Sequence, residues 1–214
     1  MKKVTILAEV KTDICKGCKV CEKVCPVHAI EAGEKTDWIA VVDSERCMGC
    51  SNCEQRCPHK AIIMLKREIP FTVGAEVDES NREAAWNLCK KARLNPEQVL
   101  CYCVGTRAEE AAAAIIGGAR TPEEVSLKTG MRTGCTIECI QPLLRLLTAS
   151  GNVPQPDKSG WQWYGQTVTA WEVSEKVKEK YNSRGFFFEE DREQMERIVE
   201  IEPRGNYCQG GEHK

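Results

Sequence analysis

The chain has 214 residues, fourteen of them cysteine, and a formal charge of −2. A near-neutral chain without runs of like charge lacks the electrostatic surface that binds nucleic acid or acidic lipid. No apolar run approaches the ~20 residues that span a bilayer, and residues 4–8 are too short for a signal-peptide core. We therefore expect a cytoplasmic protein with no membrane span. The length allows one or two domains, and the clustering of the cysteines favours two.

The first part of the chain contains one cysteine motif twice, with an offset of 32 residues. Its form is C-x2-C-x2-C-x3-C-P, the run that wraps a cubane iron–sulfur cluster. The first copy holds Cys15, Cys18, Cys21 and Cys25; the second holds Cys47, Cys50, Cys53 and Cys57. Such an exact internal repeat of metal ligands predicts two similar clusters in one small domain.

The spacing also predicts which thiols share a cluster. Three cysteines on a tight loop reach three irons of one cube, and the cysteine before proline reaches the other cube. The first [4Fe-4S] cluster should then take Cys15, Cys18, Cys21 and Cys57, and the second should take Cys47, Cys50, Cys53 and Cys25. Gly17 and Gly49 should relieve crowding in the two loops. Structural zinc has no use for the third cysteine of each run, and disulfides do not suit a chain without a secretory signal.

Residues 1–66 thus resemble a bacterial-type ferredoxin with two four-iron clusters. Short strands are expected at residues 4–10, 39–42 and 62–65, around the cluster loops. His28 and His59 follow the Cys-Pro turns, where they either tune a cluster through hydrogen bonds or lie on the surface; neither is assigned as a ligand. Residues 66–77 are predicted to be a connector.

A helix is expected from about residue 79 to 94, with Asp78 as its N-cap and Asn95-Pro96 after its end. Cys89 lies on the apolar face of this helix and has no neighbour at metal-ligand spacing. A lone cysteine in that position is typical of a small core residue.

The next motif is a pair of short cysteine runs. Cys101 and Cys103 enclose Tyr102, and after 31 intervening residues Cys135 and Cys139 enclose three residues. Helices are expected at residues 108–116 and 140–149, with a shorter helix capped by Thr121-Pro122 and ended by Gly130 between them. Two cysteine pairs on loops beside short helices can converge on one small cluster.

Residues 97–150 resemble the bacterioferritin-associated ferredoxin domain, an all-helical module with one two-iron cluster. Similar modules occur in the nitrogenase iron–sulfur scaffold protein and in several flavin-dependent dehydrogenase complexes. The resemblance implies a [2Fe-2S] cluster on Cys101, Cys103, Cys135 and Cys139. The family's closing pair is usually C-x2-C, so the C-x3-C spacing here puts the role of Cys139 in question. In a helix the extra residue would rotate its thiol by about 100°, whereas a bulged loop would absorb it. Zinc on four thiolates and an empty site are the alternatives.

The last 64 residues hold nine of the chain's thirteen aromatic side chains. A linker at 151–160 precedes two expected polar helices, at 168–180 and 189–201. Aromatic residues dominate interface energetics, which favours docking onto a partner, although the aromatics could instead cover the chain's own domains. Cys208 should be a free thiol in the tail.

The expected fold class is α+β: a ferredoxin-like dicluster domain at 1–66, a connector and helix at 67–96, a small all-α [2Fe-2S] domain at 97–150, and a mostly helical extension at 151–214. Gly117-Gly118 follows a helix, so it is not a dinucleotide fingerprint, and no nucleophile–base set stands out.

The resemblances therefore imply an electron-transfer subunit that relays single electrons between a flavoprotein dehydrogenase subunit and another carrier. The alternatives are a free polyferredoxin and, from the helical module alone, a cluster scaffold or iron-release partner.

Overall fold

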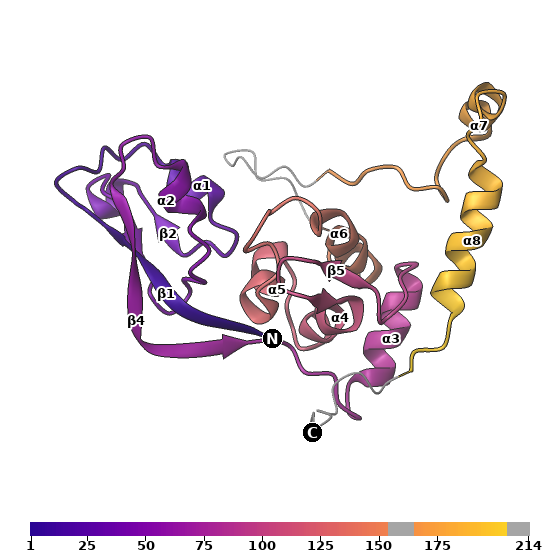
Figure 1. The fold of residues 1–214 in the computed structure, drawn as a ribbon, viewed down its shortest axis with the longest axis horizontal. Helices are drawn as coiled ribbons and strands as arrows, with labels where there is room; N and C mark the ends of the chain where they lie inside the picture. Colours follow the sequence, from indigo (N-terminus) through magenta and orange to yellow (C-terminus); the bar gives the residue numbers. More distant parts are fainter. Residues whose placement is uncertain (154–164, 205–214) are drawn as a thin grey trace, which may run out of the picture.

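The structure, a computed structural model, describes residues 1–153 and 165–204. Two units with separate hydrophobic cores lie side by side, and a helical arm follows them in the chain (Figure 1). Helices and strands both contribute, as the α+β prediction requires.

The first unit is built around one antiparallel ribbon. Strand β1 (Lys2–Val10) pairs with β4 (Ile62–Val73). The short strands β2 (Ile30–Glu31) and β3 (Val41–Val42) form a second antiparallel pair. The strand expected at 4–10 is confirmed, and that at 39–42 is shorter than expected. The connector predicted at residues 66–77 is wrong for residues 66–73, which belong to β4. Residues 71–73 pair with Lys2–Val4, and Pro70 falls in the irregularity between Val4 and Ile6, where a missing N–H is tolerated.

Two short helices repeat the cysteine motif in space. Helices α1 (Val20–Val24) and α2 (Asn52–Arg56) each follow a left-handed N-cap residue, Lys19 and Ser51, with φ of 63° and 62°. In the loops before them, Gly17 and Gly49 also have positive φ, and a Cβ would lie 2.3 Å from the Trp38 oxygen or 2.5 Å from the Ile6 oxygen. The crowding that these glycines relieve therefore comes from the neighbouring backbone.

The second unit packs four helices around an apolar core. These are α3 (Arg82–Lys91), α4 (Ala108–Ile116), α5 (Pro122–Thr129) and α6 (Ile140–Ala149). The predictions for α4, α5 and α6 are confirmed, including the Thr121 cap, which accepts a hydrogen bond from the Glu124 N–H at 3.2 Å. The lone cysteine of α3, Cys89, is fully buried in this core, as expected.

Two details of the second unit differ from prediction. Helix α3 begins only at Arg82, because the Asp78 carboxylate accepts hydrogen bonds from the N–H groups of Ser80 and Asn81 and closes a turn before the helix. The unit is also not all-helical. Strands β5 (Val99–Cys101) and β6 (Thr106–Arg107) form a hairpin that carries the first cysteine pair.

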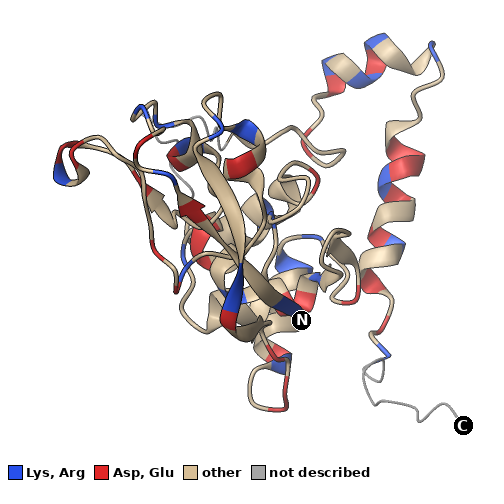
Figure 2. Cartoon of the chain, turned by 60° about the vertical axis from the view of Figure 1, so that its left-hand side comes forward, with Lys and Arg blue, Asp and Glu red and all other residues tan. Residues whose placement is uncertain are grey.

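The arm consists of α7 (Glu175–Asn182) and α8 (Phe188–Glu200). The helix expected from residue 168 starts later, because the Thr169 N–H and hydroxyl donate to the Glu172 carboxylate in a separate turn. Acidic and basic side chains are mixed along both arm helices (Figure 2). Asn95 holds the end of α8 by donating to the carbonyls of Ile198 and Ile201 at 2.9 and 3.0 Å. Trp161, Trp163, Tyr164 and Cys208 lie outside the described residues.

Candidate iron–sulfur cluster sites

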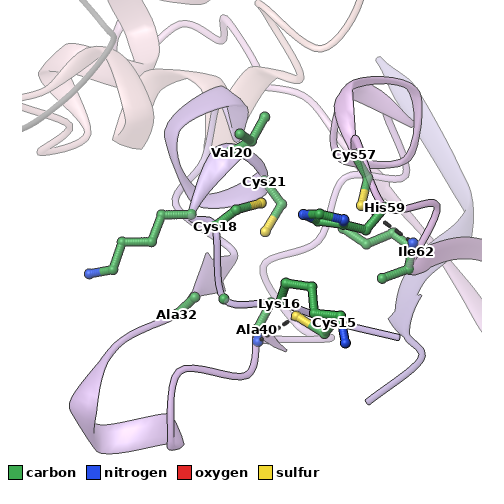
Figure 3. Close-up of a pocket in the computed structure, with 13 residues that line it drawn as sticks. Cys15, Lys16, Cys18, Val20, Cys21, Ala32, Ala40, Cys57, His59 and Ile62 are labelled. Carbon is green, nitrogen blue, oxygen red and sulfur yellow. Dashed lines mark hydrogen bonds between the residues drawn. The ribbon is translucent and has the colours of Figure 1, made fainter. Parts of the chain in front are cut away.

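The cysteines of the two repeated motifs line two separate cavities in the first unit. The first cavity is bordered by Cys15, Cys18, Cys21 and Cys57, which Figure 3 shows around one space. The second is bordered by Cys25, Cys47, Cys50 and Cys53. Each motif thus contributes its fourth cysteine to the other cavity. The ligand assignment stays a prediction, and this arrangement supports it.

Backbone N–H groups point at the sulfur atoms in equivalent places. The Ala29 N–H donates to the Cys25 sulfur at 3.2 Å, and the Ala61 N–H donates to the Cys57 sulfur at 3.3 Å. In both motifs the donor N–H belongs to the residue four positions after the cysteine. The repeat therefore includes the hydrogen bonds to these sulfurs. Such bonds stabilise thiolate charge and are one of the levers that set a cluster's potential.

The two cavities differ in their other walls. Lys16, Lys19 and the exposed His59 border the first cavity, whereas Met48 and Met64 border the second. His59 therefore borders the first cavity while remaining on the surface, and its tuning of a cluster through a hydrogen bond stays a prediction. Because nearby charge and solvent access change cluster potentials, the two sites should not be equivalent in redox behaviour.

Burial raises the thiol pKa in both cavities. Desolvation is the largest cause for Cys21, whose pKa rises to about 11, and for Cys53, whose pKa rises to about 12. The pKa values of Cys25 and Cys50 are raised for the same reason. Iron binds the thiolate, so cluster assembly at these sites must release the protons of these thiols.

The third group of cysteines lies in the second unit. Cys101 at the end of β5 and Cys139 at the N-terminus of α6 are buried, and their thiols share a hydrogen bond. That bond, donated by Cys139, lowers the pKa of Cys101 to about 6 and raises that of Cys139. Cys103 and Cys135 are exposed, and the Cys135 N–H donates to the Cys103 sulfur at 3.4 Å. The structure thus arranges the four predicted residues as two contacting pairs, Cys101 with Cys139 and Cys103 with Cys135, and the ligand assignment stays a prediction.

The loop that carries Cys135 shows how the C-x3-C spacing is accommodated. Residues 130–139 are not helical, and Thr136 takes a left-handed conformation with φ of 63°. This bulged loop turns Cys139 back toward Cys101. Gly134 packs directly on Cys103, so a Cβ there would lie 2.5 Å from the Cys103 Cβ. The close contact of Gly134 with Cys103 was not predicted from the sequence. The only signal for it was that a glycine directly precedes the candidate ligand Cys135.

Two cavities lined by cysteines of a repeated motif, and a third cysteine group on a helical unit, define an iron–sulfur protein. Residues 14–61 match the family model of the 4Fe-4S dicluster domain, and residues 99–149 match that of the BFD-like [2Fe-2S] binding domain. The chain thus carries a ferredoxin-type dicluster domain followed by a [2Fe-2S] domain of the type first expected from its cysteine spacing. Neither a curated protein nor a solved structure matched the chain.

The residues present fit these groups: four cysteines line each cavity of the first unit, two cysteine pairs are in contact in the second unit, and backbone N–H groups donate to the sulfurs of Cys25 and Cys57. Among the described residues, no helix is long and apolar enough to cross a membrane.

Proposed function

We propose that this chain is the iron–sulfur electron-transfer subunit of a multi-subunit, flavin-dependent oxidoreductase. The observation that carries the proposal is the presence of three four-cysteine sites on one chain, two in the dicluster domain and one in the [2Fe-2S] domain. Iron–sulfur clusters supply one-electron transfer when bound. The chain's own residues would hold two [4Fe-4S] clusters and one [2Fe-2S] cluster, shield the buried sulfurs from water, and present the outer sulfurs to partners.

The exposed thiols mark where partners would approach. Cys18 is exposed at the first site, and Cys103 and Cys135 are exposed at the third, whereas three of the four cysteines at the second site are buried. Beside the third site, Tyr102 and Ile137 are 79% and 71% exposed. Large apolar side chains so exposed next to a redox site suit contact with another protein.

The arm supplies a second candidate contact, which we assign to a flavoprotein subunit. Phe186 and Phe187 are 53% and 55% exposed at the corner between α7 and α8. Phe186 meets Tyr181 edge-on and stacks near Phe188, which gives the corner a preformed aromatic surface. Trp171 behaves differently: its indole N–H donates to Glu196, and Arg93 lies over its ring, so this aromatic belongs to internal packing.

The test is anaerobic affinity isolation of the full chain from its own cells, with flavin and subunit stoichiometry measured on the product. The proposal predicts a stoichiometric flavoprotein. A monomer without flavin would instead establish a free polyferredoxin. Transfer of the two-iron cluster to an apo-acceptor protein, with retention of both cubanes, would favour the scaffold function.

A further inference from the structure

One residue touches both the helical cysteine site and the dicluster domain. The backbone N–H of Arg132 acts to lower the thiol pKa of Cys101 and of Cys139, and Arg132 lies three residues before Cys135 in the same loop. Its guanidinium reaches across the boundary between the units, where Nη1 donates to the Pro26 carbonyl at 3.4 Å. Pro26 directly follows Cys25, which lines the second cavity. Arg132 thus connects the third cysteine group, through its backbone, to the neighbourhood of the second one, through its side chain.

The guanidinium is fixed by a buried ion pair. Arg132 Nη1 lies 3.0 Å from the Glu123 carboxylate on α5, and the two side chains are only 5% and 8% exposed. A buried charge pair of this kind is a poor source of net stability but strongly restricts the geometry of both partners. Arg132 also adopts a left-handed backbone with φ of 63°, a conformation that a non-glycine residue keeps only where its surroundings hold it.

Lys2 forms a second bridge across the same boundary. Its Nζ donates to the Thr133 hydroxyl at 2.6 Å, and its side chain covers Gly130, where a Cβ would lie 3.0 Å from the Lys2 Cβ. Burial lowers the pKa of Lys2, while thiolates from both units, those of Cys50, Cys47 and Cys101, act in the opposite direction. The ammonium group therefore lies within the field of the second and third sites together.

In the described residues, the first cavity is not connected to the helical unit by a side-chain bridge of this kind. Its walls come from residues 15–21, from Ala32 and Ala40, and from residues 57–62, all within the dicluster domain. Contacts that join the units include those of Lys2, of Pro26, and of Leu127 on α5, which packs against the dicluster core.

We infer that Arg132 and Lys2 are positioning residues that lock the helical cysteine site against the second dicluster site, so that these two sites are neighbours and the first is remote. The inference rests on the proposed function in that it orders the three sites within the electron-transfer subunit. It needs no partner protein, and it places the exposed first and third sites at opposite ends of the series, with the most buried site between them.

The experiment measures magnetic coupling between paramagnetic clusters in the full chain, reduced anaerobically and studied by electron paramagnetic resonance. In the wild type, the [2Fe-2S] signal should show enhanced relaxation. This enhancement should persist in Cys18→Ser, which disturbs the first site, and be lost in Cys50→Ser, which disturbs the second. Loss in Cys18→Ser alone, or no enhancement in the wild type, would overturn the inference.

A second set of variants keeps every cysteine. Arg132→Met should weaken the coupling while leaving the iron content unchanged. Glu123→Gln should weaken the coupling less than Arg132→Met, because it removes the ion pair that fixes the guanidinium but keeps the Arg132 side chain and its bond to Pro26. Likewise, Lys2→Met should lower the potentials of the second and third sites, since a nearby cation favours the more negative reduced state, whereas the exposed Lys3→Met should not. Unchanged coupling in Arg132→Met and unchanged potentials in Lys2→Met would refute the positioning role.

These outcomes separate the inference from the proposed function. A chain with three coupled clusters but no flavoprotein partner would remove the proposed function and leave the site order standing. A flavoprotein complex in which the first site couples to the third would support the proposed function and refute the site order.

Discussion

The thiols of Cys101 and Cys139 lie in hydrogen-bond contact, although one ends a β-hairpin strand and the other begins α6. The contact matters because Cys139 stands one position later than the usual spacing of its family allows. The left-handed residue Thr136 takes up the additional length, so the buried Cys139 faces the same site as the exposed Cys135. We therefore expect Cys139 to be a ligand.

Replacing Cys139 with serine should abolish the [2Fe-2S] signal and reduce the iron content from about ten to about eight atoms, because the third site loses one of its thiolates. The two cubane signals should remain. Cys89→Ser is the control: this cysteine is equally buried but lies in the core of α3. It should cost about 1–3 kcal/mol of stability through its buried hydroxyl and leave all three signals intact. Full retention of the two-iron signal in Cys139→Ser would disprove the assignment.

Cys57→Ser should damage the cluster of the first cavity, although Cys57 belongs to the second motif. The reason is that its sulfur lines the cavity of Cys15, Cys18 and Cys21. Cys25→Ser should damage the other cluster for the equivalent reason. Site-resolved redox titration of both variants checks this exchange. Loss of the second cluster in Cys57→Ser would mean that each motif binds its own cube.

Gly134→Ala should weaken the [2Fe-2S] site, because the new methyl group would lie 2.5 Å from the Cys103 Cβ and 2.6 Å from its sulfur. Overpacking of this kind costs about 1–3 kcal/mol. Gly33→Ala serves as the comparison, since its Cβ would meet only the end of the Lys19 side chain, at 3.6 Å. Thermal unfolding and two-iron retention under chelator should distinguish the two variants; equal behaviour would show that the loop around Gly134 adjusts freely.

Polar replacement of both Phe186 and Phe187 should weaken association with the flavoprotein subunit while leaving cluster spectra and unfolding temperature unchanged. Both rings are more than half exposed, so their loss costs little in the free chain. Ile69→Ser, at an 81% exposed position of the dicluster domain, is the surface control. Binding measured on the purified complex tests this prediction. Unaltered binding of the double variant would show that the aromatic corner is not the contact.

Much of this arrangement was predictable from local signals. The cysteine spacing, the Thr121 cap and the apolar runs of α4 and α6 each depend on residues close in sequence, and the structure agrees with them. The extension of β4 to Val73 was not predictable in this way, because its pairing with Lys2–Val4 is a contact between distant residues that overrides the turn tendency of Pro70.

The residues that join the two domains were missed for a related reason. Arg132 and Lys2 look like ordinary surface cations in the sequence, and neither belongs to a motif. Arg132 meets Glu123 only when the helical unit folds, and the contacts of Arg132 with Pro26 and of Lys2 with Thr133 form only when the units pack together. The sequence allows either a helix or a bulged loop at the C-x3-C spacing. Only the folded chain, in which Thr136 is left-handed, shows that the loop forms.

The central claim is that one chain holds three clusters, and the most direct test is iron and zinc analysis with Mössbauer spectroscopy on anaerobically purified protein. We predict about ten irons, distributed over two [4Fe-4S] clusters and one [2Fe-2S] cluster. A reproducible content of about eight irons with one zinc would contradict the account, because the helical site would then be structural and the electron path would end within the dicluster domain.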